Sequence, residues 1–227
     1  MSLKIVFMGT PEFSLPALKI LKKMNYKIVC VYTQPPKKKS RGQKILKTPV
    51  HIFSENEGLE IRTSKLTGKD EYNKFLKLKP DLVIVAAYGQ IIPDIYLETP
   101  NLIFLNIHAS LLPRWRGAAP IERAILNKDS QTGVSIMKIE KKLDTGPFIK
   151  QVKVEIKNDT TSGELLKTLS VIGAEALKDS IQLISSGNAV FRNQNEKDVT
   201  YAKKIDKSET RINWSEKADD TIAKINA

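Results

Sequence analysis

The first 33 residues alternate strand, helix and strand, and this order constrains the fold more than any other feature of the sequence. Residues 3–8 and 26–33 are short runs rich in Val, Ile and Tyr, which is typical of strands. Between them, apolar residues recur at helical spacing, with Thr10 as the expected N-cap and Pro11 at the first helical position. A strand–helix–strand unit of this length makes a parallel sheet with a right-handed crossover. The sequence therefore predicts an α/β fold.

The remaining predicted elements continue this alternation as far as Gly187. Strands are predicted over residues 59–63, 81–88, 101–108, 133–140 and 148–156, and the last two are expected to pair antiparallel. Helices are predicted over residues 50–56, 70–79 and 118–127, and a long one begins at Thr161, where Glu164 completes a capping box. The run 82–87 is almost wholly apolar, as in a central strand covered on both faces. We expect a Rossmann-like, doubly wound, mostly parallel sheet with helices on both faces.

Composition limits the class of protein. Hydrophobic residues make up 41% of the 227 residues, enough to form a core. The longest apolar run, 82–88, is far shorter than the roughly 20 residues needed to cross a bilayer. A single cysteine, Cys30, precludes an internal disulfide, and two histidines make a structural zinc site improbable. The first strand begins at residue 3, so no signal or transit peptide is expected. These features predict a soluble intracellular protein.

The net charge of +12 is concentrated near the N-terminus. Residues 1–50 hold 11 Lys and Arg and one acid, Glu12. Residues 35–50 contain no acid and six cations: Lys37, Lys38, Lys39, Arg41, Lys44 and Lys47. Such a segment is typical of a polyanion-binding surface, and its alternative interpretation is a solvated, flexible loop.

Polar residues at the ends of predicted strands are the candidates for chemistry, because ligands of doubly wound sheets bind there. The first turn, residues 9–13, lacks the three-glycine dinucleotide fingerprint. Asn106 and His108 are two residues apart on a predicted strand and so share a face, an arrangement suited to stabilising an oxyanion. The alternatives are a turn asparagine and a buried histidine. Asp144, in an Asp-Thr-Gly turn, would by itself be an ordinary turn residue.

Four motifs occur in order along the chain: Gly-Thr-Pro-Glu-Phe at 9–13, Ala-Tyr-Gly-Gln-Ile-Ile-Pro at 87–93, residues 106–121 with Asn-Ile-His-Ala-Ser-Leu-Leu-Pro-Arg-Trp-Arg-Gly, and Leu-Asp-Thr-Gly at 143–146. Together they resemble the methionyl-tRNA formyltransferase family. The Asn-x-His…Asp set is shared more widely by enzymes that use 10-formyltetrahydrofolate. The resemblance implies transfer of a formyl group from 10-formyltetrahydrofolate, as co-substrate, to the α-amino group of methionyl initiator tRNA.

The resemblance also implies roles for individual residues. The catalytic set would be Asn106, His108 and Asp144, with the first two stabilising the oxyanion during direct amine attack and Asp144 orienting His108 and assisting proton transfer. No metal and no covalent nucleophile are expected. The folate would be bordered by Ala87, Tyr88, Gly89, Ile91, Ser110, Leu111, Leu112 and Pro113. The tRNA would contact Lys37, Lys38, Lys39, Arg41, Lys44, Arg114 and Arg116, with Arg41 matching the key arginine of the family's acceptor-stem loop.

The expected organisation is a catalytic domain over residues 1–189, a linker over 190–205, and the incomplete start of a C-terminal β-barrel, tRNA-binding domain over 206–227. The resemblance further implies a bacterial cytoplasmic enzyme, and we expect a monomer. Two alternatives stay open. The first is a formyltransferase acting on a small molecule, such as a sugar amine or a glycinamide nucleotide. The second is a non-catalytic RNA-binding module.

Overall fold

The computed structural model describes residues 3–39 and 44–227. The chain divides into two compact units, Met1–Ile107 and His108–Ala227. Seven strands form one mostly parallel hydrogen-bonded sheet, and two shorter pairs of strands are separate from it. The order in the sheet is β10 (Phe148–Glu155), β9 (Gln131–Lys138), β7 (Ile103–His108), β6 (Leu82–Ala86), β1 (Lys4–Gly9), β2 (Lys27–Tyr32) and β5 (Ile61–Arg62). The predicted doubly wound α/β class is confirmed.

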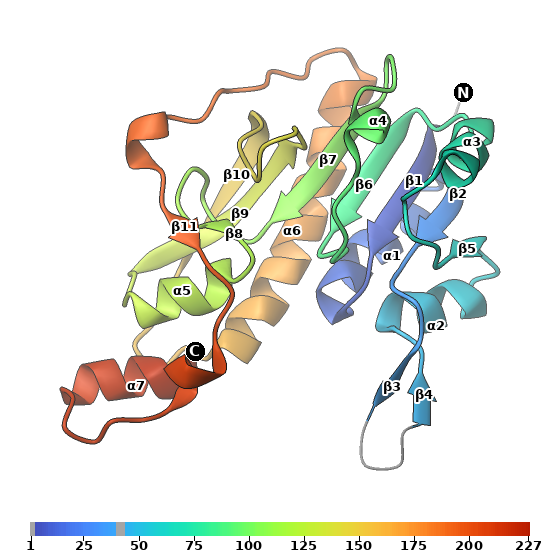
Figure 1. The fold of residues 1–227 in the computed structure, drawn as a ribbon. Helices are drawn as coiled ribbons and strands as arrows, with labels where there is room; N and C mark the ends of the chain where they lie inside the picture. The colour runs from blue at the N-terminus through green and yellow to red at the C-terminus, as the bar shows by residue number, and fades with distance from the viewer. Residues whose placement is uncertain (1–2, 40–43) are drawn as a thin grey trace. The chain divides into compact units, whose positions relative to one another are not determined.

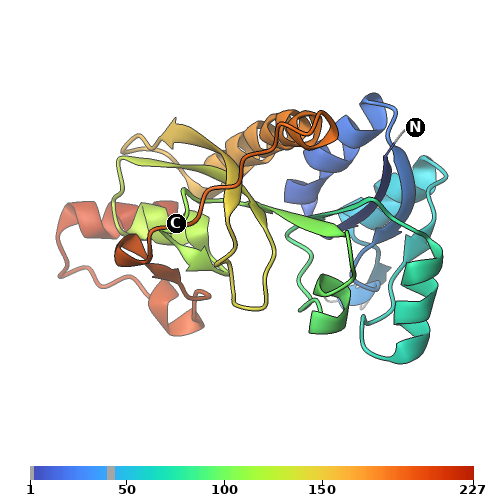
Figure 2. The same ribbon diagram turned by 90° about the horizontal axis from the view of Figure 1, so that it is seen from above.

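The first unit is a parallel sheet with helices on both faces (Figure 1). Its central strand, β1 (Lys4–Gly9), pairs in parallel with β2 (Lys27–Tyr32) and β6 (Leu82–Ala86), and these pair with β5 (Ile61–Arg62) and β7 (Ile103–His108). The helices are α1 (Leu15–Lys23), α2 (Pro49–Asn56), α3 (Lys69–Lys77) and the short α4 (Asp94–Leu97). Within this unit, α1 and α3 lie on opposite faces of the strands (Figure 2).

The core of the first unit is formed by the central strands. All five residues of β6 are buried, which confirms the central strand predicted from the apolar run. On the face covered by α3, the Phe75 ring lies 4.9 Å from Tyr96 and 6.3 Å from Phe104, centroid to centroid. These contacts fix α3 against the sheet through aromatic packing.

The predicted N-cap of the first helix is wrong. A 3-10 turn, η1 (Glu12–Ser14), precedes α1, and Ser14 occupies the N-cap position without a side-chain cap. The Thr10 hydroxyl instead donates to the carbonyl oxygen of Tyr88 at 2.7 Å, and the Ser14 hydroxyl donates to that of Ala86 at 2.6 Å. Both side chains therefore bind the end of β6, far away in sequence, rather than their own helix.

Part of the basic segment forms a hairpin. Strands β3 (Lys37–Lys39) and β4 (Lys44–Leu46) pair antiparallel, with Lys37 opposite Leu46 (Figure 1). Arg41 lies outside the described residues. Lys47, which follows the hairpin, forms an ion pair with Glu55 at 2.7 Å. Residues 37–39 and 44–46 of the basic segment are therefore paired strands and not irregular loop.

The second unit is built on one helix and two strands. Strands β9 (Gln131–Lys138) and β10 (Phe148–Glu155) pair antiparallel, as predicted, and the long helix α6 (Ser162–Ser185) packs on both. The Thr161–Glu164 capping box is confirmed. The helix buries an apolar stripe that includes Leu165, Leu169 and Ile181. Helices α5 (Pro120–Leu126) and α7 (Ala218–Asn226) also contact each other in this unit.

The segment predicted as a linker, 190–205, packs on the second unit. It contains a 3-10 turn, η2 (Glu196–Asp198), and a short strand, β11 (Tyr201–Ala202), that pairs in parallel with β8 (Arg116–Gly117). A further 3-10 turn, η3 (Lys207–Thr210), precedes α7. Among the helices described, none is long and apolar enough to cross a membrane.

Candidate active site

His108 is the last residue of β7, and its side chain is held by a backbone group. The residue is 5% exposed, and its Nε2 lies 2.9 Å from the carbonyl oxygen of Trp115. A carbonyl oxygen can only accept, so Nε2 carries the hydrogen. This bond fixes the orientation of the ring, so Nδ1 is the ring nitrogen that can face another group.

Asp144 lies on the Nδ1 side of the ring. Its Oδ2 is 3.7 Å from His108 Nδ1 and accepts a hydrogen bond from the backbone N–H of Gly117 at 2.9 Å. The structure thus brings His108 and Asp144 together, as predicted. At 3.7 Å the contact is electrostatic rather than a hydrogen bond. The resemblance assigned the orientation of the imidazole to Asp144, and the structure adds a second contact to the ring, the bond from Nε2 to the Trp115 carbonyl oxygen.

Asn106 stands two residues before His108 on the same strand. In an extended strand alternate side chains leave the same face, so Asn106 and His108 point to a common side of β7. Asn106 is half-buried, so part of its side chain is open to solvent. Its donor is therefore available to a bound molecule.

Trp115 is pinned in a strained conformation. Its φ of 61° is in the left-handed region, which costs roughly 1–2 kcal/mol for a residue with a Cβ. The backbone N–H donates to the Thr200 hydroxyl at 2.8 Å, and the indole N–H donates to Asp129 at 2.7 Å. The Trp115 carbonyl that binds His108 is thus held in place by bonds from the backbone and from the side chain of the same residue.

Arg114 and Asp129 reinforce this arrangement. The Arg114 guanidinium donates two hydrogen bonds to Asp129, at 2.6 and 2.8 Å, and lies 4.6 Å from the Trp115 ring. Burial tends to raise the pKa of Asp129, but the hydrogen bonds from Arg114, Trp115 and Asn127 outweigh it and lower that pKa. Arg114 is 40% exposed, so one face of its predicted tRNA-binding group still reaches solvent.

Arg116, which was expected to contact the tRNA, is buried. Its side chain is 1% exposed, and its guanidinium is bound to Glu196 at 2.7 Å and to Gln194 at 2.9 Å. The hydrogen bond from Arg116 lowers the pKa of Glu196. An arginine buried in this way holds the protein's own chain and has no donor left on the surface for a phosphate.

The segment 110–113, predicted to border the folate, is mostly internal. The Ser110 hydroxyl is fully buried and donates to the Arg114 carbonyl, and the backbone N–H of Leu112 donates to Ser135. Leu112 is buried, while Leu111 and Pro113 are half-buried. Only Leu111 and Pro113 therefore keep side-chain surface that a ligand could contact.

The other predicted folate segment follows β6 in the first unit. Ala87 and Gly89 both have left-handed φ angles, 45° and 79°. Tyr88 is buried, and among the described residues its hydroxyl has no hydrogen-bond partner. Burial raises the pKa of this phenol. Ile91 is 91% exposed, so it presents a free apolar surface.

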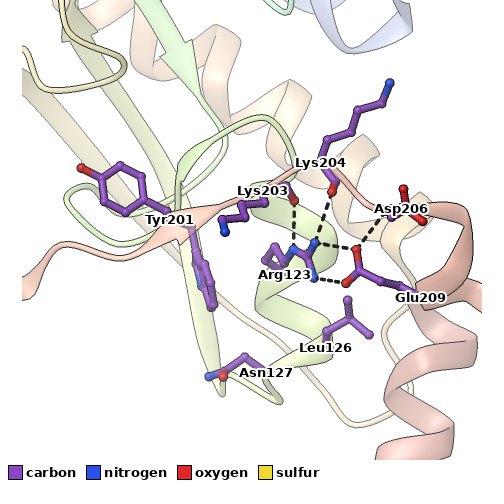
Figure 3. A pocket seen from close by; sticks show the side chains of 9 residues that line it. Arg123, Leu126, Asn127, Tyr201, Lys203, Lys204, Asp206 and Glu209 are labelled. Carbon is purple, nitrogen blue, oxygen red and sulfur yellow. Dashed lines mark hydrogen bonds and ion pairs between the residues drawn. The ribbon is translucent and has the colours of Figure 1, made fainter.

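Trp115 also lines a pocket of 620 Å³ in the second unit (Figure 3). At its centre Arg123 donates to the carbonyls of Lys203 and Lys204 and forms a bidentate ion pair with Glu209. Neither His108 nor Asp144 lines this pocket. The bonds of Arg123 hold residues 203–209 against α5. The pocket is therefore lined by residues other than the candidate catalytic ones.

The described residues contain no group of three or more His, Cys, Asp or Glu side chains placed to hold a metal ion. The groups around the His108 ring are the Asp144 carboxylate, the Trp115 carbonyl oxygen and the Gly117 N–H, which is bound to Asp144. The carboxylate and the carbonyl only accept, so the donors that could meet a developing negative charge are the ring of His108 and the amide of Asn106.

The sequence matches a family model described as formyl transferase over residues 3–181. It is 48% identical over 228 aligned residues to the methionyl-tRNA formyltransferase of Pelagibacter ubique, covering 100% of this chain and 74% of that protein. The methionyl-tRNA formyltransferase of Brucella anthropi is 47% identical, covering 96% and 72%. The chain belongs to the methionyl-tRNA formyltransferase family. Like the other members of this family, it is a formyl transferase.

Solved structures with the same fold are more distant in sequence. An N-formyltransferase from Helicobacter canadensis, in complex with folinic acid and dTDP-3-aminofucose, superposes with a TM-score of 0.77 at 21% identity and covers 100% of this chain and 80% of its own. A 4-N formyltransferase from Francisella tularensis gives 0.77 at 19% identity, with coverage of 99% and 87%. These similarities show that the chain shares its fold with these two formyltransferases.

Four residues around the site of this family member were not predicted: Asp129, Gln194, Glu196 and Thr200. Each binds Trp115 or Arg116 from a position at least 14 residues away in sequence. None of them lies within the four motifs that carry the family resemblance, and no local pattern distinguishes them from surface polar residues.

Proposed function

We propose that this protein transfers the formyl group of 10-formyltetrahydrofolate to the α-amino group of methionyl initiator tRNA. The observation that carries the proposal is the approach of His108 Nδ1 and Asp144 to 3.7 Å, with Asn106 on the same strand face as His108. Relatives 45–48% identical to this chain, and named for this reaction, support the choice of acceptor.

In the proposed reaction the neutral amine attacks the formyl carbon, and the carbonyl oxygen gains negative charge. An N–C bond forms to the amino acid, the bond from the formyl carbon to the folate nitrogen breaks, and the folate nitrogen gains a proton in place of the one that the amine loses. Asn106 and a protonated His108 donate to the oxyanion; since Nε2–H is bound to Trp115, the donor is Nδ1–H. Loss of one such donor costs about 10²–10³ in kcat in other enzymes.

Asp144 is proposed to assist the proton transfer. The attacking amine must lose a proton, and an unperturbed α-amino group has a pKa of about 7.7–8.0, so part of it is neutral near pH 7. Asp144 Oδ2 already accepts from Gly117, which leaves Oδ1 free to hold a water molecule that takes the proton. No covalent intermediate is needed.

The folate is proposed to contact Ala87, Tyr88, Gly89, Ile91 and segment 110–113, through side chains of Leu111 and Pro113 and through backbone at the buried Ser110 and Leu112. The tRNA is proposed to contact Lys37, Lys38, Lys39, Arg41, Lys44 and Arg114. Arg116 is left out of this surface because it is buried and paired. Lysine and arginine contacts to phosphates position the nucleic acid without reading its sequence.

One incubation tests the function against its alternatives. The protein is mixed with 10-formyltetrahydrofolate labelled in the formyl group and with methionyl initiator tRNA, a sugar amine or a glycinamide nucleotide. Label on the tRNA-bound methionine supports the proposal. Label on a small amine only would make the protein a small-molecule formyltransferase. Binding of the tRNA by the protein without formyl transfer to any acceptor would support the second alternative, a non-catalytic RNA-binding module.

Arg41→Ala tests the basic segment. Phosphate contacts contribute to binding rather than to chemistry, so KM for the tRNA should rise while kcat changes little. Lys167→Ala, which removes an exposed cation from α6, is the charge-matched control. An Arg41→Ala KM equal to that of the control would return the basic segment to the interpretation of a solvated loop.

A further inference from the structure

The side chain of Gln194 joins the Asp-Thr-Gly turn to strand β8 of the second unit. Its amide nitrogen donates to the carbonyl oxygen of Asp144 at 2.8 Å and to that of Gly146 at 2.7 Å. Its amide oxygen accepts from Nε of Arg116 at 2.9 Å. One half-buried amide thus spans from the Asp-Thr-Gly turn to the segment that follows Trp115.

The chemistry of the partners fixes which end of the amide goes where. Carbonyl oxygens only accept, so the two on the Asp144 side require the NH₂ group. The guanidinium of Arg116 only donates, so it requires the amide oxygen. A glutamate of the same shape would keep the bond to Arg116 and would place a second oxygen against two carbonyl oxygens.

The turn held by Gln194 has reason to need support. Asp144 has a φ of 50°, in the left-handed region that costs roughly 1–2 kcal/mol for a residue with a Cβ. Such a conformation persists only where the surroundings enforce it. Bonds to the carbonyls of Asp144 and Gly146 fix the backbone on both sides of Thr145, and with it the direction in which the Asp144 carboxylate leaves the chain.

The other end of the bridge reaches the same carboxylate by a second route. Arg116 precedes Gly117, whose N–H donates to Asp144 Oδ2. The guanidinium of Arg116 is held by Gln194 and Glu196 together, and both come from segment 190–205. Gln194 therefore sets the distance between the N–H of Gly117, which binds the Asp144 carboxylate, and the backbone of Asp144 itself.

We propose that Gln194 is a positioning residue for Asp144: it holds the strained Asp144 turn so that the carboxylate lies beside His108 Nδ1. The inference rests on the proposed function of Asp144. It assigns to a segment predicted as a linker a direct part in shaping the active site.

Gln194→Glu is the main test, because it keeps the size of the side chain and the acceptor for Arg116. We expect kcat for formyl transfer to fall about 10- to 100-fold, since a misplacement of about 1 Å can cost 10²-fold, with KM for both substrates within about threefold. Asn193→Ala, an exposed neighbouring amide, is the matched control and should behave as wild type. Thermal unfolding of each variant shows whether it is folded.

A double variant distinguishes positioning from a general structural role. If Gln194 acts through Asp144, adding Gln194→Glu to Asp144→Asn should cause no further loss of kcat. Losses that multiply, or a folded Gln194→Glu with wild-type kcat, would overturn the inference. If Gln194→Glu does not fold, the same comparison is made with Gln194→Ala. Full activity of Asp144→Asn alone would instead refute the proposed catalytic role of Asp144.

Discussion

Gly146, in the Asp-Thr-Gly turn, allows a substitution whose effect can be worked out from the geometry. A Cβ added there would lie 2.0 Å from the carbonyl oxygen of Lys138 and 2.9 Å from its carbonyl carbon. Cβ atoms essentially never approach closer than 3.0 Å, so the two segments must separate by at least 1.0 Å. Lys138 ends β9 and donates its backbone N–H to Pro147 at 2.9 Å, so it cannot move away freely.

The turn that carries Asp144 must therefore absorb the displacement in Gly146→Ala. A shift of about 1 Å in a catalytic group can lower kcat about 100-fold. Overpacking of a tight site costs about 1–3 kcal/mol of unfolding free energy, and Tm falls by about 2–4 °C for each kcal/mol in a protein of this size. Both effects should appear together in this variant.

The assay measures kcat for formyl transfer and Tm, with Gly163→Ala as the control. Gly163 lies in the first turn of α6 and has no atom within 4 Å of an added Cβ. Alanine there should leave kcat unchanged and raise stability by about 0.4–1 kcal/mol, because it restricts the unfolded chain. A Gly146→Ala variant with wild-type kcat and Tm would refute the reasoning.

Three further predictions concern stability and reactivity. The hydrogen bond from Arg123 lowers the pKa of Glu209 from 4.5 to about 2. The ion pair therefore stabilises the folded protein above pH 4.5, and this contribution is lost as the pH falls toward 2. The Tm difference between wild type and Glu209→Gln should shrink over that pH range, and a constant difference would contradict the prediction. Thr161→Ala should cost about 1 kcal/mol because it removes the N-cap of α6, whereas Thr161→Ser should cost little, and equal Tm values for all three would refute the cap. Burial raises the pKa of Cys30 to about 12, so the native thiol should resist alkylation near neutral pH until the protein unfolds, and rapid labelling of native protein would argue against its burial.

The elements that could be predicted were those whose structure is determined by residues close together in the sequence. The apolar run of β6 and the Thr161–Glu164 capping box each specify their structure within a few residues, and both were confirmed. The N-cap at Thr10 was wrong because the hydroxyl bonds to the carbonyl of Tyr88, 78 residues away. A local rule cannot anticipate a tertiary partner of this kind.

The candidate site follows the same division. His108 was a candidate from its place on the predicted strand, whereas Asp144 was found through the family resemblance, and their approach could then be checked as a distance. The burial of Arg116 could not be foreseen, because a charged side chain is buried only where partners neutralise it, and its partner Glu196 lies 80 residues away. The pairing of β8 with β11 involves only two residues from each strand, too few to leave a periodic pattern.

The most direct test of the catalytic set is the single-turnover rate of formyl transfer by His108→Ala, with both substrates saturating and the tRNA affinity measured in parallel. Removal of the Nδ1–H donor should lower the rate by about 10²–10³ and leave the dissociation constant for tRNA within about twofold of wild type. A variant that transfers the formyl group at a rate near that of the wild type would remove His108 from the mechanism.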